Sequence, residues 1–490
     1  MKGKIKKIYD AAYFNRKLVY DKAGEYVKKL EERNKILNAF VHYDLVALTN
    51  SICDVGRELL YDCVNELSGV PYCVKDNICT RRFKATCGSK ILENYMPEYC
   101  SDVYTALRQK GALCVGSTNM DEFAMGSSCE NSIYGASNNP HDEKRITGGS
   151  SGGAAAAVAA EMTVFALGSD TGGSVRQPAA HCGCIGLKPT YGSVSRHGLI
   201  AYASSFDEIG ILARSAEDTA IVFDIISKYK ENDLTTTMQR QHRTVRALEK
   251  SVRGLRIGVD SDIFLGASPE VSRAIERAIN EYKSLGAEVV PVRMPGGKEC
   301  LAVYYTLVCA EAASNLSRYD GVRYGRRAKQ YSDIEDMMKK SRTEGFGTEV
   351  KRRIMLGNFV LSSEHYDKYY VKAQNMRKAI CAQTDELFED VDLLLTPTAP
   401  TTAPLHGAFD NDILSAYSSD IYTVLPNICG IPAISIPCGF DSNRMPIGMQ
   451  LMAGKFCERT LIRAASAFEN QLGEDEMYGN PKHGGGIIEL

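Results

Sequence analysis

The sequence predicts an α/β protein, in which helices pack against a β-sheet. Helical patterns alternate with short apolar runs typical of buried strands at residues 102–116 and 255–292, and a further apolar run covers residues 391–395. Of the 490 residues, 44% are apolar and 24% charged, which is the ordinary composition of a globular protein with a large core. At about 150 residues per domain the length would suggest about three domains, so the domain count depends on where the motifs fall.

The first sixty residues have a helical pattern. Ile36, Leu37, Phe40 and Val41 recur at helical spacing, while lysine and glutamate fill the other positions. We therefore expect residues 1–60 to form an N-terminal helical arm that packs on the rest of the chain or docks a partner.

Residues 102–116 predict a helix followed by a strand. Asp102 is a suitable N-cap, Val103 and Leu107 would face inward, and Gly111 would end the helix before the buried strand Ala112–Gly116. A helix that leads into a short buried strand is typical of an α/β layer.

Residues 255–292 predict a complete β-α-β unit. Leu255–Val259 has the pattern of a buried strand, and Ser268–Glu270 provides an N-cap, a first-turn proline and an acidic residue for the next helix. Gly286 would end that helix before a strand at 289–292. A right-handed crossover would make the two strands parallel. The helix would bury one face, made of Val271, Ala274, Ile275, Ala278, Ile279 and Tyr282.

Three further segments complete the outline. Val391–Leu395 predicts a strand that leads into the loop 396–404, where repeated prolines exclude a helix. The polar segment 230–250 predicts a surface loop. Residues 476–490, which include the glycines 484–486, are expected to form a flexible C-terminal tail.

The charge balance argues against unaided tight binding to nucleic acid. The 58 Lys and Arg nearly balance the 60 Asp and Glu, whereas a protein that binds a phosphate backbone usually has a basic surface. The basic start Met1–Lys7 is not followed by an apolar block, and the longest run of small apolar residues, Gly152–Ala160, is too short to span a membrane. We expect a cytoplasmic protein without a membrane partner.

Sixteen cysteines are scattered over the chain without C-x-x-C modules, so we expect reduced thiols packed in the core. Cys182 and Cys184 form the closest pair, with His181 beside them, but a second half-site of metal-ligand spacing is missing. We expect no metal site.

Two Gly/Ser-rich loops are the most unusual feature. The first, residues 148–153 (GGSSGG), runs directly into the helix-forming segment Ala154–Ala160, and the second covers residues 168–174 (GSDTGGS). Such loops can direct several backbone N–H groups at one point, where they bind a phosphate or an oxyanion. Neither loop has the residue order of the common phosphate-binding motifs, which favours acyl transfer by a serine.

A serine nucleophile needs a base, because its hydroxyl is hardly ionised near neutral pH. His181 and His197 are nearby in the sequence, and a buried Lys75 could also lose its proton near neutral pH. A serine in a glycine-rich loop can also be an ordinary turn residue, and a single lysine can also be a solvated charge on the surface. The residues alone leave these interpretations open.

The strings GGSSGG (148–153) and GSDTGGSVRQPA (168–179), together with Lys75, resemble the amidase-signature family. Lys75 precedes Ser150 by 75 positions and Ser174 follows Ser150 by 24, as in that family. The resemblance implies a nucleophile Ser174, a bridging Ser150 at a cis peptide bond and a base Lys75. It implies an oxyanion hole from the backbone N–H groups of Thr171, Gly172, Gly173 and Ser174.

The resemblance also implies the architecture. Because the shared residues extend from Lys75 to Asp420, we expect one catalytic domain over residues 61–475 instead of three modules. Its fold would be a central mixed twisted β-sheet covered by helices on both faces.

Four segments resemble the A (glutaminase) subunits of the glutamyl-tRNA(Gln) amidotransferases: 119–128, 187–210, 345–357 and 431–439. The first three are much more specific than the core shared by all amidases. The similarity implies a glutamine pocket lined by Tyr304, Arg353 and Asp420. Asp420 would pair with the α-ammonium of glutamine and Arg353 with its α-carboxylate. Which of Arg352 and Arg353 faces the pocket is open.

This resemblance implies hydrolysis of glutamine to glutamate and ammonia. In the family, a B subunit uses ATP and Mg²⁺ to convert Glu-tRNA(Gln) to Gln-tRNA(Gln), and a C subunit completes a heterotrimer; this chain would bind no cofactor itself. The alternatives are a free-standing amidase that hydrolyses small amides, and a non-catalytic nucleotide-binding or assembly subunit.

Overall fold

The computed structural model describes residues 3–14, 23–44, 65–237, 243–264, 266–410, 412–479 and 481–484. The strands in this part of the chain are β1 (Phe40–Tyr43), β2 (Pro71–Lys75), β3 (Leu113–Thr118), β4 (Phe165–Asp170), β5 (Ile185–Lys188), β6 (Glu208–Ala213), β7 (Arg256–Asp260), β8 (Glu288–Val292), β9 (Leu393–Pro397), β10 (Ala433–Phe440) and β11 (Pro446–Ala453). The longer helices are α1 (Lys4–Phe14), α3 (Ala23–Leu37), α5 (Asp102–Gln109), α6 (Gly152–Ala159), α7 (Arg176–Cys182), α8 (Ala216–Ile226), α9 (Pro269–Ser284), α10 (Gly297–Asn315), α11 (Ile334–Gly345), α12 (Thr348–Leu361), α13 (Lys372–Asp390) and α16 (Glu458–Leu472). Shorter helices are α14 (Ile413–Ser418), α15 (Val424–Cys429) and α17 (Glu474–Tyr478).

All eleven of these strands form one sheet, in the order β1-β3-β2-β4-β6-β5-β10-β11-β9-β7-β8. The pairs β2–β3, β2–β4, β7–β8 and β7–β9 are parallel, and the other neighbouring pairs are antiparallel. The predicted mixed sheet is therefore confirmed.

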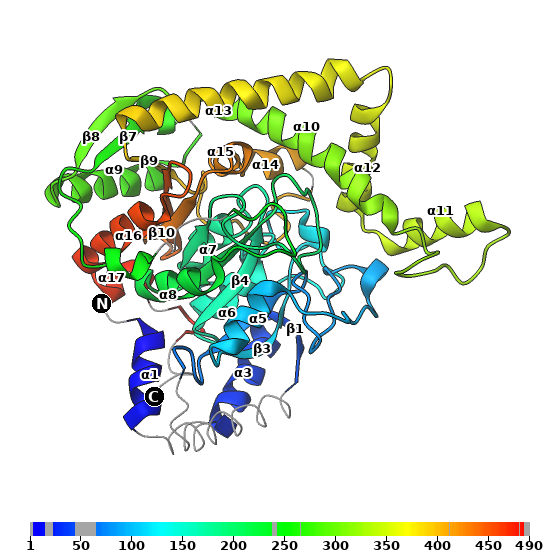
Figure 1. Cartoon of the computed structure of the whole chain (residues 1–490), viewed down its shortest axis with the longest axis horizontal. Coiled ribbons are helices and arrows are strands. Elements are labelled where there is room, and N and C mark those ends of the chain that lie inside the picture. Colours follow the sequence, from blue (N-terminus) through cyan, green and yellow to red (C-terminus); the bar gives the residue numbers. More distant parts are fainter. Residues whose placement is uncertain are drawn as a thin grey trace.

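Helices cover both faces of the sheet, as predicted. Along β4, Phe165 and Leu167 belong to one hydrophobic cluster, while Ala166 between them belongs to another, because successive side chains of a strand point to opposite faces. The first face packs against α8, α9 and α16, and the second against α6 and α7 (Figure 1). Near-continuous burial of β4 and its neighbours follows from this double cover.

The β-α-β prediction is confirmed. β7 and β8 are parallel, and α9 begins after Ser268, whose hydroxyl accepts a hydrogen bond from the Val271 N–H. All six side chains of the predicted inward face are buried. The predicted helix at residue 102 is also present as α5, but its N-cap is Ser101 instead of Asp102, because the Ser101 hydroxyl accepts from the Tyr104 N–H.

The helical prediction is wrong at Phe40 and Val41. Helix α3 ends at Leu37, and the Asn34 side chain then both accepts from the Phe40 N–H and donates to the Phe40 carbonyl. These two bonds turn the chain into strand β1, which pairs antiparallel with β3 at the sheet edge. Of the predicted arm, residues 45–60 lie outside the described residues.

The C-terminal prediction is wrong in part. Met477 and Tyr478, within the predicted tail, are buried in α17, and the Tyr478 hydroxyl donates to Glu469. The glycines 485 and 486 lie outside the described residues. In the predicted surface loop, Thr244 and Ala247 are buried in a short 3₁₀ helix, while residues 238–242 are likewise outside the described part.

Long helices extend from one side of the sheet. In Figure 1, α10 and α13 lie above the central strands, α12 lies to their right, and α11 lies at the far end of this extension. Helices α10 and α12 pack closely against each other and have Tyr304 and Arg353 on them. No helix among the described residues is long and apolar enough to cross a membrane.

Candidate active site

The sheet places Lys75 beside the second Gly/Ser-rich loop. Lys75 is the last residue of β2. Residues 168–170 of the predicted loop form the end of β4, so the loop itself begins directly after Asp170. Because β2 and β4 are neighbouring parallel strands, their carboxyl ends lie at the same edge of the sheet, where open α/β sheets bind ligands. Ser150 reaches this edge from the loop before α6, and its peptide bond to Gly149 is cis, as the resemblance implies.

Lys75 and Ser150 are in direct contact. The Lys75 Nζ lies 2.7 Å from Ser150 Oγ, 2.9 Å from Ser169 Oγ and 3.2 Å from the Ser169 carbonyl. Both Lys75 and Ser150 have an exposed fraction of 0%. Burial lowers the pKa of Lys75 to about 8, although the nearby Asp121 carboxylate acts to raise it. A base of this pKa is partly neutral near pH 7, as proton transfer requires.

Ser174 lies at the open end of this group. It has an exposed fraction of 8%, and its carbonyl accepts from the Ser151 N–H at 3.0 Å, which joins the two loops directly. Within the part of the chain that the structure describes, no hydrogen bond joins the hydroxyls of Ser174 and Ser150. Catalytic hydrogen bonds are often long without substrate.

The second loop leaves several backbone donors unused. Among the described residues, the N–H groups of Thr171, Gly172 and Ser174 make no hydrogen bond to a protein acceptor. The fourth predicted donor differs, because the Gly173 N–H already donates to Asp170 Oδ1 at 2.8 Å. The geometry thus supports three of the four predicted oxyanion-hole donors, and Gly173 is part of the loop's own support.

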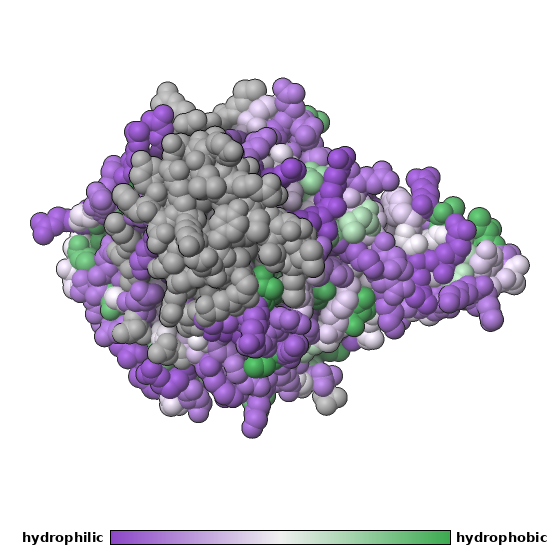
Figure 2. Space-filling view, turned by 90° about the horizontal axis from the view of Figure 1, so that it is seen from below, coloured by the Kyte–Doolittle hydropathy of each residue, from purple (hydrophilic) through white to green (hydrophobic). Residues whose placement is uncertain are grey.

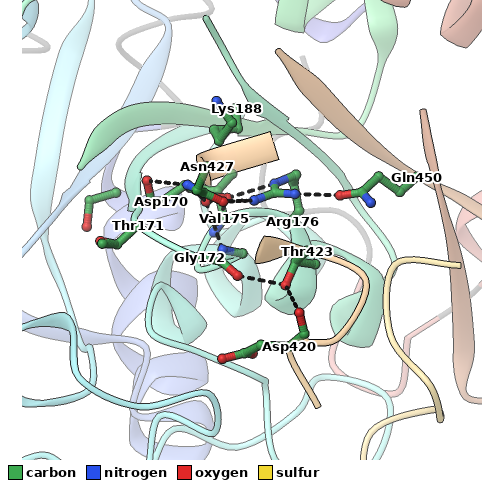
Figure 3. Close-up of polar contacts among 12 residues, drawn as sticks. Asp170, Thr171, Gly172, Val175, Arg176, Lys188, Asp420, Thr423, Asn427 and Gln450 are labelled. Atoms are coloured by element: carbon green, nitrogen blue, oxygen red, sulfur yellow. Dashed lines mark hydrogen bonds and ion pairs between the residues drawn. The ribbon is translucent and has the colours of Figure 1, made fainter. Parts of the chain in front are cut away.

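A buried ion pair fixes the base of this loop (Figure 3). The Arg176 guanidinium lies 2.9 Å from Asp170 Oδ1, and both side chains are completely buried. Arg176 also donates to Asn427 at 2.6 Å and to Gln450 at 2.5 Å. Burial alone would raise the pKa of Asp170, but the Arg176 charge holds it well below its usual range. Asp170 is therefore ionised and can accept from the loop.

Three of the six N–H groups in the first loop donate to acceptors elsewhere in the protein. The Gly149 N–H donates to Gln177, the Ser151 N–H to the Ser174 carbonyl and the Gly153 N–H to the Asn119 carbonyl. Since these three N–H groups already have protein acceptors, they are not available to a phosphate.

Arg353 lies inside the protein and Arg352 does not. Both are on α12, but the exposed fraction of the side chain is 4% for Arg353 and 34% for Arg352. Arg353 donates to Tyr202 at 2.6 Å and to Glu349 at 2.8 Å. Its guanidinium also lies about 5.5 Å from the ring centres of Tyr202, Tyr305 and Tyr417. A cavity of about 200 Å³ is lined by both arginines and by Ser127, Glu349 and Tyr417.

Asp420 is a buried carboxylate with two hydroxyl partners. Tyr305 donates to its Oδ2 at 2.7 Å and Ser127 to its Oδ1 at 3.0 Å. Burial raises the pKa of Asp420 to about 6, against the lowering effect of these hydroxyls and of Arg353. It is therefore mostly ionised at pH 7. Asp420 and Arg353 supply opposite charges, but Asp420 is not among the residues that line the cavity beside Arg353.

Tyr304 lies against the second Gly/Ser-rich loop, whose residues Thr171–Ser174 are called the oxyanion loop below. It is buried on α10, and a Cβ added at Gly172 would overlap its phenol ring. Its ring also meets Phe206 edge-on. The structure thus brings Tyr304 to the loop, while the neighbouring Tyr305 contacts Asp420.

The two histidines offered by the sequence are placed elsewhere. His181 is buried on α7, and burial lowers its pKa to about 4. The Nδ1 atom of His197 lies 3.6 Å from Oδ1 of Asp102. Among the described residues neither histidine shares a hydrogen bond with Ser174 or Ser150, whereas Lys75 is bonded to Ser150, so the geometry favours Lys75 as the base.

Comparison with known proteins shows which family the chain belongs to. The family model described as Amidase matches residues 23–462, which is most of the sequence. This chain belongs to the amidase family.

Individual relatives of this amidase have more specific names than the family. It is 46% identical over 445 residues to the A subunit of glutamyl-tRNA(Gln) amidotransferase from Agathobacter rectalis, covering 90% of this chain and 88% of that protein. It is 50% identical over 407 residues to the same subunit of Syntrophus aciditrophicus, covering 83% and 84%. The crystal structure of that subunit from Thermotoga maritima superposes with a TM-score of 0.79 at 36% identity, covering 99% of this amidase and 97% of that chain.

Sequence reasoning missed several residues of the amidase site. Ser169 bonds Lys75, Tyr305 and Ser127 bond Asp420, and Glu349 bonds Arg353. Two weak signals were present: Ser127 lies within segment 119–128, and Glu349 precedes Arg353 by four residues, the spacing of a helical ion pair. Nothing in the sequence distinguishes Tyr305 from Tyr304 as the partner of Asp420.

Proposed function

We propose that this amidase is the glutamine-hydrolysing subunit of a tRNA-dependent amidotransferase, working in the cytoplasm. The observation that carries the proposal is the buried Lys75, hydrogen-bonded to Ser150 beside the Ser174 loop. The similarity to relatives named as A subunits of glutamyl-tRNA(Gln) amidotransferase supports the choice of reaction, and the opposite charges of Asp420 and Arg353 support a free amino acid as substrate.

The proposed reaction begins with neutral Lys75. Lys75 takes the Ser150 proton while Ser150 takes the Ser174 proton, and the Ser174 oxygen bonds to the side-chain amide carbon of glutamine. The N–H groups of Thr171, Gly172 and Ser174 donate to the resulting oxyanion, each contributing on the order of 3 kcal/mol. The C–N bond then breaks, the leaving nitrogen takes the proton from Lys75 through Ser150, and ammonia departs.

A water molecule completes the cycle. Activated by the same Lys75–Ser150 pair, it adds to the γ-glutamyl ester on Ser174, and the ester bond breaks to release glutamate and restore the Ser174 hydroxyl. The overall change is glutamine plus water to glutamate plus ammonia.

The proposal includes partner subunits. Ammonia would pass to a B subunit that amidates Glu-tRNA(Gln) with ATP and Mg²⁺, and a C subunit would complete a heterotrimer. Relatives named as A subunits of an amidotransferase support membership in such a complex. This chain's own residues would bind neither ATP nor Mg²⁺.

Trapping of the acyl-enzyme tests the proposal. We expect that the purified complex, mixed with the γ-hydroxamate of glutamate and quenched in acid, carries one glutamyl group on the peptide that contains Ser174. Mass spectrometry of the digested protein measures this, with the Lys75→Met variant as the uncharged control. Absence of added mass would contradict catalysis by this chain, and fast turnover of simple amides by the isolated chain would favour a free-standing amidase.

The pH profile tests the role of Lys75. Because only neutral Lys75 can accept a proton and its pKa is about 8, kcat/KM for glutamine should rise about tenfold per pH unit below pH 8 and level off above it. At pH 7 about one molecule in ten would have the neutral amine. Steady-state assays from pH 6 to 9.5 measure this. A flat profile in the wild type, or the same rise in the residual activity of Lys75→Met, would contradict the assignment.

A further inference from the structure

We propose that Thr423 is a positioning residue that fixes the orientation of one peptide group in the oxyanion loop. The inference rests on the proposed function, since it assigns Thr423 a part in stabilising the oxyanion of glutamine hydrolysis. Thr423 is completely buried and directly precedes α15.

The peptide group between Gly172 and Gly173 is bound at both ends. The Thr423 hydroxyl donates to the Gly172 carbonyl at 2.7 Å (Figure 3), and the Gly173 N–H donates to Asp170 Oδ1 at 2.8 Å. In a trans peptide the C=O and the N–H point in opposite directions. Thr423 and the buried ion pair of Asp170 therefore approach this peptide from its two sides and together specify one orientation.

A loop of two glycines needs such support. Gly172 and Gly173 lack the Cβ atoms that restrict rotation, and Gly173 has a φ of +130°. A rotation of the peptide between them would change ψ of Gly172 and φ of Gly173. Unless these two angles change by equal and opposite amounts, the neighbouring peptides, which contain the N–H groups of Gly172 and Ser174, turn as well. Because oxyanion donors stabilise charge only when aimed correctly, this rotation would reduce catalysis.

The neighbouring residues explain why glycine is required here. A Cβ at Gly172 would overlap Tyr304, and a Cβ at Gly173 would overlap the Thr423 side chain. The Tyr304 and Thr423 side chains therefore leave no space for a Cβ at either glycine. Thr423 can approach the loop closely only because residue 173 has no side chain.

Thr423 also connects this loop to the predicted ammonium site. Its hydroxyl lies 3.2 Å from the Asp420 carbonyl, and its N–H donates to the same carbonyl at 3.0 Å. Asp420 and Thr423 thus form one tight turn, with the carboxylate at one end and the loop contact at the other. The residue that would bind the α-ammonium of glutamine and the residue that orients the oxyanion loop are parts of the same turn.

Thr423→Val and Thr423→Ser separate the hydroxyl from the shape of the side chain. Valine keeps the shape and loses the hydrogen bond, so we expect kcat for glutamine to fall roughly tenfold, with KM changed less than about twofold. Serine keeps the hydroxyl, so we expect kcat within about threefold of wild type. Both are measured on the purified complex, together with the melting temperature.

A boronic acid with the α-amino and α-carboxyl groups of glutamine separates oxyanion binding from substrate binding. Its boron becomes tetrahedral and negative when Ser174 Oγ adds to it. We expect Thr423→Val to weaken its binding by the same roughly tenfold factor as kcat, and to leave the binding of glutamate within about twofold. A merely structural role would weaken both ligands together.

The outcomes are distinguishable. Equal loss in the Val and Ser variants, or a Val variant as active as wild type, would overturn the positioning role. Loss of glutamate binding in parallel with boronate binding would overturn it as well. If the wild-type complex itself fails to hydrolyse glutamine, the proposed function is overturned, irrespective of Thr423.

Discussion

We expect the Ser174→Ala variant to lose glutamine-dependent formation of Gln-tRNA(Gln) completely while keeping the ammonium-dependent reaction. The alanine removes the only atom that would bond to the amide carbon, so hydrolysis should fall by several orders of magnitude, about 10⁶-fold in comparable serine hydrolases. Added ammonium bypasses this step, because the partner subunit then receives its nitrogen directly. The measurement is amidation of Glu-tRNA(Gln) by the complex with either nitrogen source.

A serine outside the site provides the matched control. Ser466 is buried on α16, and its hydroxyl donates to the Leu248 carbonyl at 2.9 Å. Ser466→Ala removes one buried hydroxyl of the same kind, and both reactions should stay close to wild type. If Ser174→Ala loses the ammonium-dependent reaction as well, Ser174 is needed for the structure or assembly of the complex and not for chemistry alone.

The second large effect concerns stability. We expect Arg176→Met to lower the free energy of unfolding by about 3–5 kcal/mol, because it leaves the Asp170 carboxylate buried without its counter-ion. Asn427 and Gln450 lose their donor in the same substitution. Because the chain has no tryptophan, denaturant unfolding is best followed by far-UV circular dichroism.

The double variant Asp170→Asn/Arg176→Met is the control for this effect. It removes both charges with little change in shape, so it should be more stable than Arg176→Met alone. If the double variant is no more stable, the loss comes from packing around residue 176 and not from an uncompensated charge. Glutamine hydrolysis should stay low in both variants, because the Gly173 N–H loses its ionised acceptor or that acceptor's support.

Local signals predicted much of the sheet and its helices. At α9, the Ser-Pro-Glu start and the inward face from Val271 to Tyr282 follow from capping and periodicity, and the structure has both. At Phe40 the same reasoning failed, because a strand edge and the Asn34 side chain determine the backbone there. A four-residue strand is too short for its own pattern to outweigh an adjoining helix.

Some features of the site could likewise be predicted from the sequence, and others could not. The spacing of Lys75, Ser150 and Ser174 matches a known family, and the contact between Lys75 and Ser150 is present in the structure. The sequence could not reveal that the Gly173 N–H is occupied, since its acceptor Asp170 depends on a loop conformation. Likewise, Thr423 is 251 residues from Gly172, and only the packing of α15 against the loop brings them together.

The position of β10 and β11 determines when this site can form during synthesis. These strands come from residues 433–453, yet in the sheet they lie between β5 and β9. Without them, no strand pairing joins strands β1 to β6 to strands β7 to β9, and β5 and β9 would each have an unpaired edge that can join another chain. The amidase therefore acquires a continuous sheet only near the end of translation, and fragments that stop before residue 433 should aggregate.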